Sequence, residues 1–142
     1  MCGVFGAFCK NGESVLEDVY LGLYALQHRG QESAGIAWND GKDGKVLSSR
    51  GMGLVHIALD QQQLSSISAR SAIGHVRYST SGASDLSNAQ PISANYSMGS
   101  LAIAHNGNIT NASGIRSMLE SRGAIFQSTT DTETIIHLMA HQ

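Results

Sequence analysis

Short apolar segments, separated by polar and glycine-rich stretches, constrain the fold of this chain more than any other feature. They predict β-strands at residues 4–8, 33–39, 45–50, 72–76 and 100–104. The first is expected to be fully buried, and the next two to pair as a hairpin across residues 40–44. The expected helices are fewer and fall between groups of strands. We therefore expect an α+β chain in which sheets are layered with helices, rather than a parallel doubly wound sheet.

Capping patterns predict where two of the helices begin. Ser14 and Glu17 have the spacing of a capping box, with Ser14 as N-cap and Glu17 reaching back. Leucine and valine then recur on one helical face, and we expect this helix to stop at Gly30. Thr130 and Glu133 have the same spacing and predict the start of the last helix.

The rest of the chain is expected to contain two further helices and a long loop. One helix is predicted from about residue 111, and a weak one over residues 61–68. Residues 79–90 are small and polar, which predicts a surface loop of the kind that often acts as a lid. The last helix reaches Gln142 with no stop signal, so we expect the fold to be truncated at its C-terminal side.

Length, composition and charge set broad limits on function. A chain of 142 residues predicts one domain, and 42% apolar residues are enough for a core. A net charge of −2, without a lysine and arginine stripe, gives no reason to expect nucleic acid as a partner. We find neither a signal peptide nor an apolar run long enough to cross a bilayer, so no membrane partner is expected.

The cysteines and histidines predict no metal site in this chain. Cys2 and Cys9 are the only cysteines, and their spacing matches neither a zinc site nor a redox pair. We expect both to be reduced thiols in the cytoplasm. His137 and His141 are four residues apart, but without a nearby carboxylate we expect them to face the surface or a partner.

Cys2 is the candidate nucleophile. If Met1 is removed, Cys2 carries a thiol and a free α-amine on the same residue. A free α-amine titrates near 7.7–8.0 and a free thiol near 8.5, so the amine can accept the thiol proton near neutral pH. N-terminal nucleophile enzymes use this arrangement. Taken alone, Cys2 is better interpreted as a small buried apolar residue at the start of a strand.

Three motifs downstream support a catalytic interpretation. Asn106, by its side chain, and Gly107, by its backbone N–H, can stabilise a tetrahedral oxyanion, although Asn-Gly also favours a hairpin turn. Arg77 can bind a carboxylate with two hydrogen bonds, and Asp131 can pair with an ammonium group. Together they predict an α-amino acid with a hydrolysable side-chain amide, for which glutamine fits.

Six motifs resemble those of class II glutamine amidotransferases, in the expected order. They are MCGVFG at residues 1–6, LQHRGQESAGIA at 26–37, GHVRYST at 74–80, NAQP at 88–91, AHNGN at 104–108 and TDTE at 130–133. They span almost the whole chain. Within this class, HRGQESAG, HVRYST and NAQP resemble the glutamine phosphoribosylpyrophosphate amidotransferases. The sister family of glucosamine-6-phosphate synthases instead shows a YRGYDSAG, HTRWATHG and NAHP pattern.

The resemblance implies a fold and a set of residue roles. The fold is the αββα sandwich of N-terminal nucleophile hydrolases, with a glutamine amidotransferase type-2 domain over residues 2–142. Cys2 is the nucleophile, and Asn106 and Gly107 form the oxyanion hole. Arg29 and Gly30 belong to the loop that supports the nucleophile. The residues implied for glutamine binding are Arg77, Tyr78, Thr80, His105 and Asp131, with residues 78–82 closing over the substrate.

The resemblance also implies partners outside this chain. A phosphoribosyltransferase domain, which is absent here, uses the released ammonia to make phosphoribosylamine in the first step of purine synthesis. Magnesium is implied for that domain, whereas no cofactor is implied for this chain, which lacks the cysteines for an iron–sulfur cluster. The full-length protein is expected to be a homo-oligomer. Two alternatives remain open: the glutaminase part of a glucosamine-6-phosphate synthase-like enzyme, and a non-catalytic module that keeps the fold.

Overall fold

The computed structural model describes residues 1–39, 41, 43–78 and 84–140. The elements follow the order β1 (Gly3–Phe8), α1 (Leu16–Ala25), the 3-10 helix η1 (Gln27–Arg29), β2 (Ser33–Asn39), β3 (Val46–Met52), α2 (Val55–Ala58), α3 (Gln61–Ser65), β4 (Ser71–Arg77), the 3-10 helix η2 (Leu86–Asn88), β5 (Ile92–Tyr96), β6 (Gly99–Ile103), α4 (Ala112–Ser121) and α5 (Thr132–Ala140). All five predicted strands are present.

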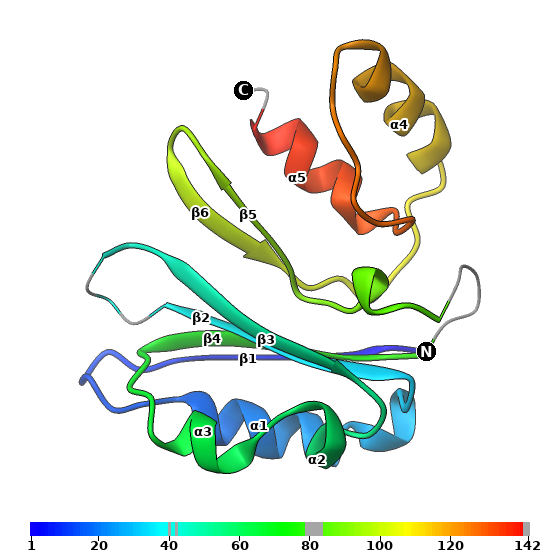
Figure 1. Cartoon of the computed structure of the whole chain (residues 1–142). Helices are drawn as coiled ribbons and strands as arrows, with labels where there is room; N and C mark the ends of the chain where they lie inside the picture. Colours follow the sequence, from blue (N-terminus) through cyan, green and yellow to red (C-terminus); the bar gives the residue numbers. More distant parts are fainter. Residues whose placement is uncertain (40, 42, 79–83, 141–142) are drawn as a thin grey trace.

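A four-stranded antiparallel sheet forms the centre of the molecule, in the order β1-β4-β2-β3. Strand β4 lies between β1 and β2, so its backbone is paired on both sides. Helices α1, α2 and α3 cover one face of this sheet (Figure 1). Their apolar side chains bury the main core with the inward residues of β2 and β4, among them Leu16, Leu23, Ile36 and Val76.

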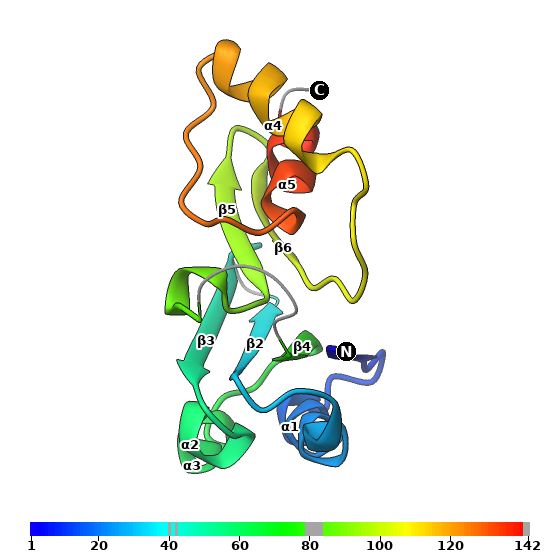
Figure 2. The ribbon, with the colours of Figure 1, turned by 90° about the vertical axis from the view of Figure 1, so that its right-hand side faces the viewer.

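The hairpin β5–β6 lies over the other face of the four-stranded sheet, and α4 and α5 lie beyond it (Figures 1 and 2). The layers therefore follow the order helix, sheet, sheet, helix. This arrangement confirms the expected αββα sandwich. Strand β5 was absent from the sequence-based expectation, because its five residues interrupt an apolar run with serine and asparagine.

Both predicted capping boxes are wrong. Helix α1 begins at Leu16 without a side-chain cap, because Ser14 bonds elsewhere. Its hydroxyl donates to the Ile67 carbonyl and accepts from the Ala69 N–H, which ties the start of the helix to the segment before β4. At the last helix, Glu133 accepts from the N–H groups of residues 127 and 128 rather than from that of Thr130.

Two predictions of burial also need correction. Strand β1 was expected to be fully buried, but Val4, Phe5 and Phe8 are exposed. The strand lies at the edge of its sheet, so the segment's apolar character does not ensure that it is covered. Conversely, the predicted surface loop contains η2, and Asn88 and Gln90 within it are buried by polar contacts to other segments.

The end of the first helix also differs from expectation. Helix α1 ends at Ala25 and is followed by η1, so Gly30 terminates the 3-10 turn rather than the α-helix. Within the described ranges, no helix combines the length and the apolar character needed to cross a bilayer.

Candidate functional site

A cavity of about 280 Å³ lies where the ends of several elements meet. It is lined by Cys2, Arg77, Tyr78, Gln90, His105, Gly107, Asn108, Thr129, Thr130 and Asp131. Cys2 directly precedes β1, Arg77 ends β4, His105 and Gly107 follow β6, and Asp131 precedes α5. Segments that are far apart in the sequence therefore bring a thiol, a guanidinium and a carboxylate to one cavity.

Cys2 is held by its main chain. Its carbonyl oxygen accepts a hydrogen bond from Arg29 Nε at 3.0 Å, and its Sγ lies 3.8 Å from the Tyr78 carbonyl oxygen. The thiol is partly exposed and unoxidised. Arg29 itself lies in η1, so this short helix anchors the residue that carries the thiol.

Gly30 allows η1 to approach the end of β4. A Cβ atom at Gly30 would lie 2.7 Å from the carbonyl carbon and oxygen of Arg77 and from the carbonyl carbon of Val76. No side chain fits between these two backbones. Gln27 stabilises the same turn with two hydrogen bonds: its amide nitrogen donates to the Gly30 carbonyl, and its side-chain oxygen accepts from the Val55 N–H. The supporting loop is therefore packed directly against the strand that presents Arg77.

Arg77 is buried and already has protein partners. Its Nε lies 3.2 Å from Glu32 Oε1, and one of its terminal nitrogens donates to the Asn88 carbonyl. The first contact is an ion pair, and the second uses one of the five N–H groups of the guanidinium. Arg77 also lines the cavity, so the contacts fix the orientation of a group that can bind a carboxylate there. Sequence reasoning missed Glu32 as its partner, because a pairing across 45 residues leaves no local pattern.

Asn88 connects the loop after β4 to the segment before α5. Its side chain donates to Thr129 Oγ1 at 2.9 Å and accepts from the Thr129 N–H at 2.9 Å. Thr129 lines the cavity, so this pair positions part of the wall. The NAQP motif contains Asn88 and carries the family resemblance, but nothing in its spacing predicts this contact.

The main chain of His105 is bonded on both sides by buried side chains. Its N–H donates to Gln90 Oε1 at 2.7 Å, and its carbonyl oxygen lies 3.2 Å from His75 Nε2. The His105 ring lies over Gly107, where a Cβ atom would be 2.6 Å from His105 Nε2. Glycine at this position therefore lets the ring and the backbone pack together.

His75 titrates well below an ordinary histidine. Burial lowers its pKa from 6.5 to about 4; the nearby charges of Arg77 and His105 also lower the pKa, while the hydrogen bond to the His105 backbone opposes them. Desolvation disfavours the charged imidazolium. His75 is therefore neutral at pH 7. The sequence motif GHVRYST contains this residue, but its burial is visible only in the fold.

Asp131 accepts a hydrogen bond from the Ile109 N–H through Oδ2, at 2.6 Å. Its other oxygen lies 4.0 Å from His105 Nδ1. The carboxylate thus holds the segment after Asn108 while it lines the cavity. A ligand ammonium would have to share this carboxylate with the protein backbone.

For three of the candidate residues, the structure gives weaker support for a place in the cavity or none. Asn106 is exposed and does not line the cavity, whereas Asn108, two residues later, does. Tyr78 lines the cavity and is 55% exposed. Thr80 and most of the expected closing loop, residues 79–82, lie outside the described residues.

The structure gathers no metal-binding group of three histidine, cysteine, aspartate or glutamate side chains among the residues it describes. His137 does have a carboxylate nearby, contrary to expectation: its Nε2 lies 3.8 Å from Glu133 Oε1. The His137 ring also packs on Phe126, with ring centroids 4.4 Å apart. His141 lies outside the described residues.

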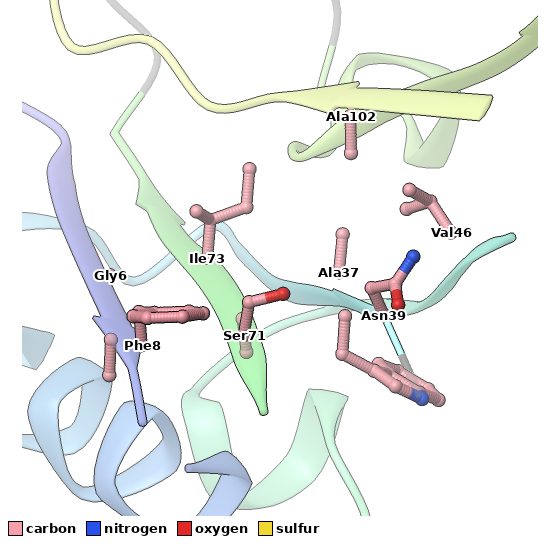
Figure 3. A pocket seen from close by; sticks show the side chains of 11 residues that line it. Gly6, Phe8, Ala37, Asn39, Val46, Ser71, Ile73 and Ala102 are labelled. Atoms are coloured by element: carbon pink, nitrogen blue, oxygen red, sulfur yellow. The ribbon is translucent and has the colours of Figure 1, made fainter. Parts of the chain in front are cut away.

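A second cavity, of about 470 Å³, lies between the four-stranded sheet and β6. Figure 3 shows Ala102 of β6 facing Ala37 and Ile73 across it. Its lining is mostly apolar, and the polar side chains there include Asn39 and Ser71 but no titratable group. This cavity offers no base that could activate the Ser71 hydroxyl, so the chemistry is concentrated around Cys2.

Comparison with known proteins gives a consistent result. A sequence family described as "Glutamine amidotransferase domain" matches residues 39–142. An amidophosphoribosyltransferase of Lacticaseibacillus casei is 48% identical, over 99% of this chain and 71% of the relative. One from Methanothermobacter thermautotrophicus is 45% identical, over 99% of this chain and 30% of the relative.

Solved structures agree with these relatives. The glutamine phosphoribosylpyrophosphate amidotransferase of B. subtilis, complexed with ADP and GMP, superposes with a TM-score of 0.85 at 40% identity. A structure described as the allosteric regulatory enzyme of purine biosynthesis gives 0.87 at 41% identity. Both matches cover all of this chain and 30% of the other chain. The chain thus spans about 30% of the length of these structures.

Proposed function

This chain belongs to the glutamine amidotransferase domain family, and on that premise we propose that it hydrolyses glutamine to glutamate and ammonia through a thioester on Cys2. The observation that carries this proposal is the shared cavity of Cys2, Arg77, Gly107 and Asp131. A nucleophile, a carboxylate-binding group, an oxyanion donor and an ammonium-binding group are the parts that this reaction needs. The family membership confirms the resemblance seen in the sequence.

The reaction proceeds in two steps. Once Met1 is removed, the Cys2 α-amine takes the thiol proton, and the thiolate attacks the side-chain amide carbon of glutamine. The tetrahedral intermediate collapses when the leaving nitrogen receives that proton, so ammonia departs and a thioester remains. Water then attacks the thioester, which releases glutamate and restores the thiol. The Gly107 N–H and the adjacent Asn106 side chain stabilise the oxyanion in both steps.

Arg77 and Asp131 hold the substrate during both steps. Arg77 binds the α-carboxylate with the donors that Glu32 and Asn88 leave over, and Asp131 binds the α-ammonium. His105, Tyr78 and Thr80 are the other residues that the family resemblance assigns to glutamine binding. Arg29 and Gly30 fix the main chain of Cys2, so the thiol is positioned before the substrate arrives.

In the whole protein, we propose that the ammonia is used by a phosphoribosyltransferase domain to make phosphoribosylamine from phosphoribosylpyrophosphate. The names of the relatives support this acceptor over a sugar phosphate. Magnesium would serve that domain rather than this one, and the whole protein would act as a homo-oligomer. Two unpaired thiols are compatible with a cytoplasmic location.

The proposal is tested by labelling with a diazo-ketone analogue of glutamine, followed by intact mass and peptide analysis. We expect cleavage of Met1 and a single label on Cys2. Cys9 is the internal control, because it is partly exposed but lies outside the cavity. In the full-length protein, Cys2→Ala should abolish glutamate release, whereas Cys9→Ala should retain it.

Equal labelling of both thiols, or glutamate release by the Cys2→Ala variant, would contradict the proposal. A retained Met1 would favour the alternative of a non-catalytic module, because the α-amine would then not belong to Cys2. Ammonia-dependent synthesis in the Cys2→Ala variant measures the acceptor reaction separately. Its loss together with glutamine use would count against two separate half-reactions.

A further inference from the structure

We propose that His75 is a positioning residue for the oxyanion hole, which it orients by donating a hydrogen bond to the His105 carbonyl. The inference rests on the proposed glutaminase function and adds a residue that does not touch the substrate. His75 is absent from the lining of the cavity, whereas His105 and Gly107 form part of it. His75 must therefore act through the main chain of residues 105–108, the segment with the sequence HNGN.

The fold places His75 where it can act as a rigid support. It lies in β4, opposite Val4 of β1 and Gly35 of β2, and its side chain has no exposed surface. At the preceding residue, Gly74, a Cβ atom would face Leu23 and Val19 of α1. Because side chains alternate along a strand, His75 points to the opposite face, toward the second layer. There its Nε2 lies 3.2 Å from the His105 carbonyl oxygen.

The chemistry of this contact fixes the tautomer of His75. A carbonyl oxygen only accepts, so Nε2 must carry the proton. Burial keeps the ring neutral at pH 7, with a pKa of about 4. Nδ1 is then an acceptor, and it is buried without a hydrogen-bond partner among the described residues. A buried polar atom without a partner destabilises the folded chain. Among the described residues, the hydrogen bond from Nε2 to the His105 carbonyl is therefore the one polar contact through which this buried ring acts.

A second buried side chain completes the support. Gln90 accepts from the His105 N–H at 2.7 Å, and its amide nitrogen donates to Thr132 Oγ1 at 3.2 Å. The donor and the acceptor of the His105 main chain are thus bound from two different segments. The His105 carbonyl shares a planar peptide group with the Asn106 N–H. Holding this carbonyl therefore sets the direction in which the chain enters Asn106 and Gly107.

Oxyanion stabilisation depends on this direction. Its donors act on charge that develops only in the transition state, and a misplacement of about 1 Å can cost about 100-fold in rate. Ground-state binding of glutamine uses Arg77 and Asp131, which His75 does not hold. Loss of the His75 bond should therefore lower kcat and leave KM for glutamine nearly unchanged.

The experiment compares His75→Met, which removes the donor, with His75→Gln, in the full-length protein. The glutamine amide nitrogen is as many bonds from Cβ as Nε2 and can donate to the same carbonyl. His56→Gln is the matched control, because His56 is exposed on α2. We expect kcat for glutamate release to fall about 10- to 100-fold in His75→Met. His75→Gln should recover most of it, and the control should equal the parent.

Two ligands separate positioning from a loss of structure. Glutamate γ-semialdehyde adds to the thiol and places a tetrahedral oxyanion in the hole, whereas glutamate forms no tetrahedral adduct with the thiol. In His75→Met we expect the aldehyde affinity to fall in proportion to kcat while glutamate affinity stays within about twofold. An unchanged aldehyde affinity, or an equal loss for both ligands, would overturn the inference.

Amide NMR spectra give a readout that does not need activity. The Asn106 and Gly107 resonances should shift in His75→Met and return toward the parent in His75→Gln. If His75→Met does not fold, His75→Asn takes its place, since its shorter side chain cannot reach the carbonyl. A parent protein that neither releases glutamate nor labels at Cys2 would refute the proposed function instead. Unshifted resonances would refute the role of His75.

Discussion

Arg77 Nε lies 3.2 Å from Glu32 Oε1, and the two side chains are only 8% and 14% exposed. Glu32 directly precedes β2, and Arg77 ends β4, so the ion pair joins the ends of two neighbouring strands. The same guanidinium lines the cavity beside Cys2. Arg77 therefore joins the ends of two central strands to the cavity in which, under the proposed function, the substrate carboxylate binds.

Arg77→Lys should mainly weaken glutamine binding. A lysine offers a point charge instead of a planar group with several donors. Loss of a charged hydrogen bond typically costs about 1.5–3 kcal/mol, so we expect KM to rise roughly 10- to 100-fold. Steady-state kinetics of glutamate release measure this effect. A fall in kcat at constant KM would instead place Arg77 in the chemical step.

Glu32→Gln separates the two roles of Arg77. It keeps the guanidinium but removes its charged partner, so we expect lower stability to chemical denaturation with a smaller effect on KM than Arg77→Lys. The buried charge left without a partner is the physical reason. An unchanged stability would show that the ion pair contributes nothing to the fold.

Several of the residues that reach the cavity could be predicted, because they lie at the end of a recognisable strand or at the start of a helix, whereas Gln90, Asn108, Thr129 and Thr130 could not. Cys2, Arg77, His105 and Asp131 lie at such ends, and the layers bring these ends together. The strands themselves could be recognised from short apolar runs. Element ends and apolar runs are both recognised from residues that are close together in the sequence, so a single sequence is enough to detect them.

The hydrogen-bond partners of polar side chains could not be predicted from the sequence. The capping-box pattern, for example, assumes that a side chain bonds to the backbone of its own helix. Ser14 bonds instead to the carbonyl of Ile67, and Glu133 to the N–H of Gln127. Asn88 and Gln90 are polar residues in a sequence that suggests a solvated loop, yet both are buried. Two of their partners, Thr129 and Thr132, lie more than 40 residues away, so only the fold reveals them.

Gly30→Ala should destabilise the protein by about 1–3 kcal/mol, as is typical of overpacking. The new methyl group would lie 2.7 Å from backbone atoms of β4, which cannot move without disturbing Arg77. Gly114→Ala is the matched control, because Gly114 lies within α4 and a Cβ atom there meets nothing within 4 Å. Alanine in a helix is about 1 kcal/mol more favourable than glycine, so the control should be slightly stabilised. Urea unfolding of both variants would reveal these opposite signs.

Glu133→Gln should destabilise the layer formed by α4 and α5. The buried carboxylate accepts from the N–H groups of Gln127 and Ser128 and from the Ser128 hydroxyl. A glutamine has one acceptor oxygen, so at least one buried donor loses its bond, at a cost of about 1–3 kcal/mol. Glu120→Gln, at an exposed position on α4, should change stability by less than about 0.5 kcal/mol. Equal effects in the two variants would contradict this role of Glu133.

His75 should make the protein less stable as the pH falls from 6.5 to 4. Its pKa is lowered from 6.5 to about 4 in the folded chain, first by burial and then by the charges of Arg77 and His105. Between these values the unfolded chain binds a proton that the folded chain does not, so the free energy of unfolding decreases on acidification. Each pH unit of difference is worth about 1.36 kcal/mol, which gives a loss of roughly 3 kcal/mol. Above pH 6.5 the contribution is constant, because His75 is neutral in both states.

The contribution of His75 is isolated by comparing its Gln variant with the parent. Urea unfolding at pH 7, 5.5 and 4.5 measures the free energy of unfolding of both proteins. Carboxylates titrate in both and cancel in the difference, whereas only the parent carries the buried imidazole. We therefore expect the parent to lose more stability than His75→Gln across this range, and His56→Gln to follow the parent. Parallel pH profiles for the parent and His75→Gln would mean that the ring accepts a proton in the folded chain without cost.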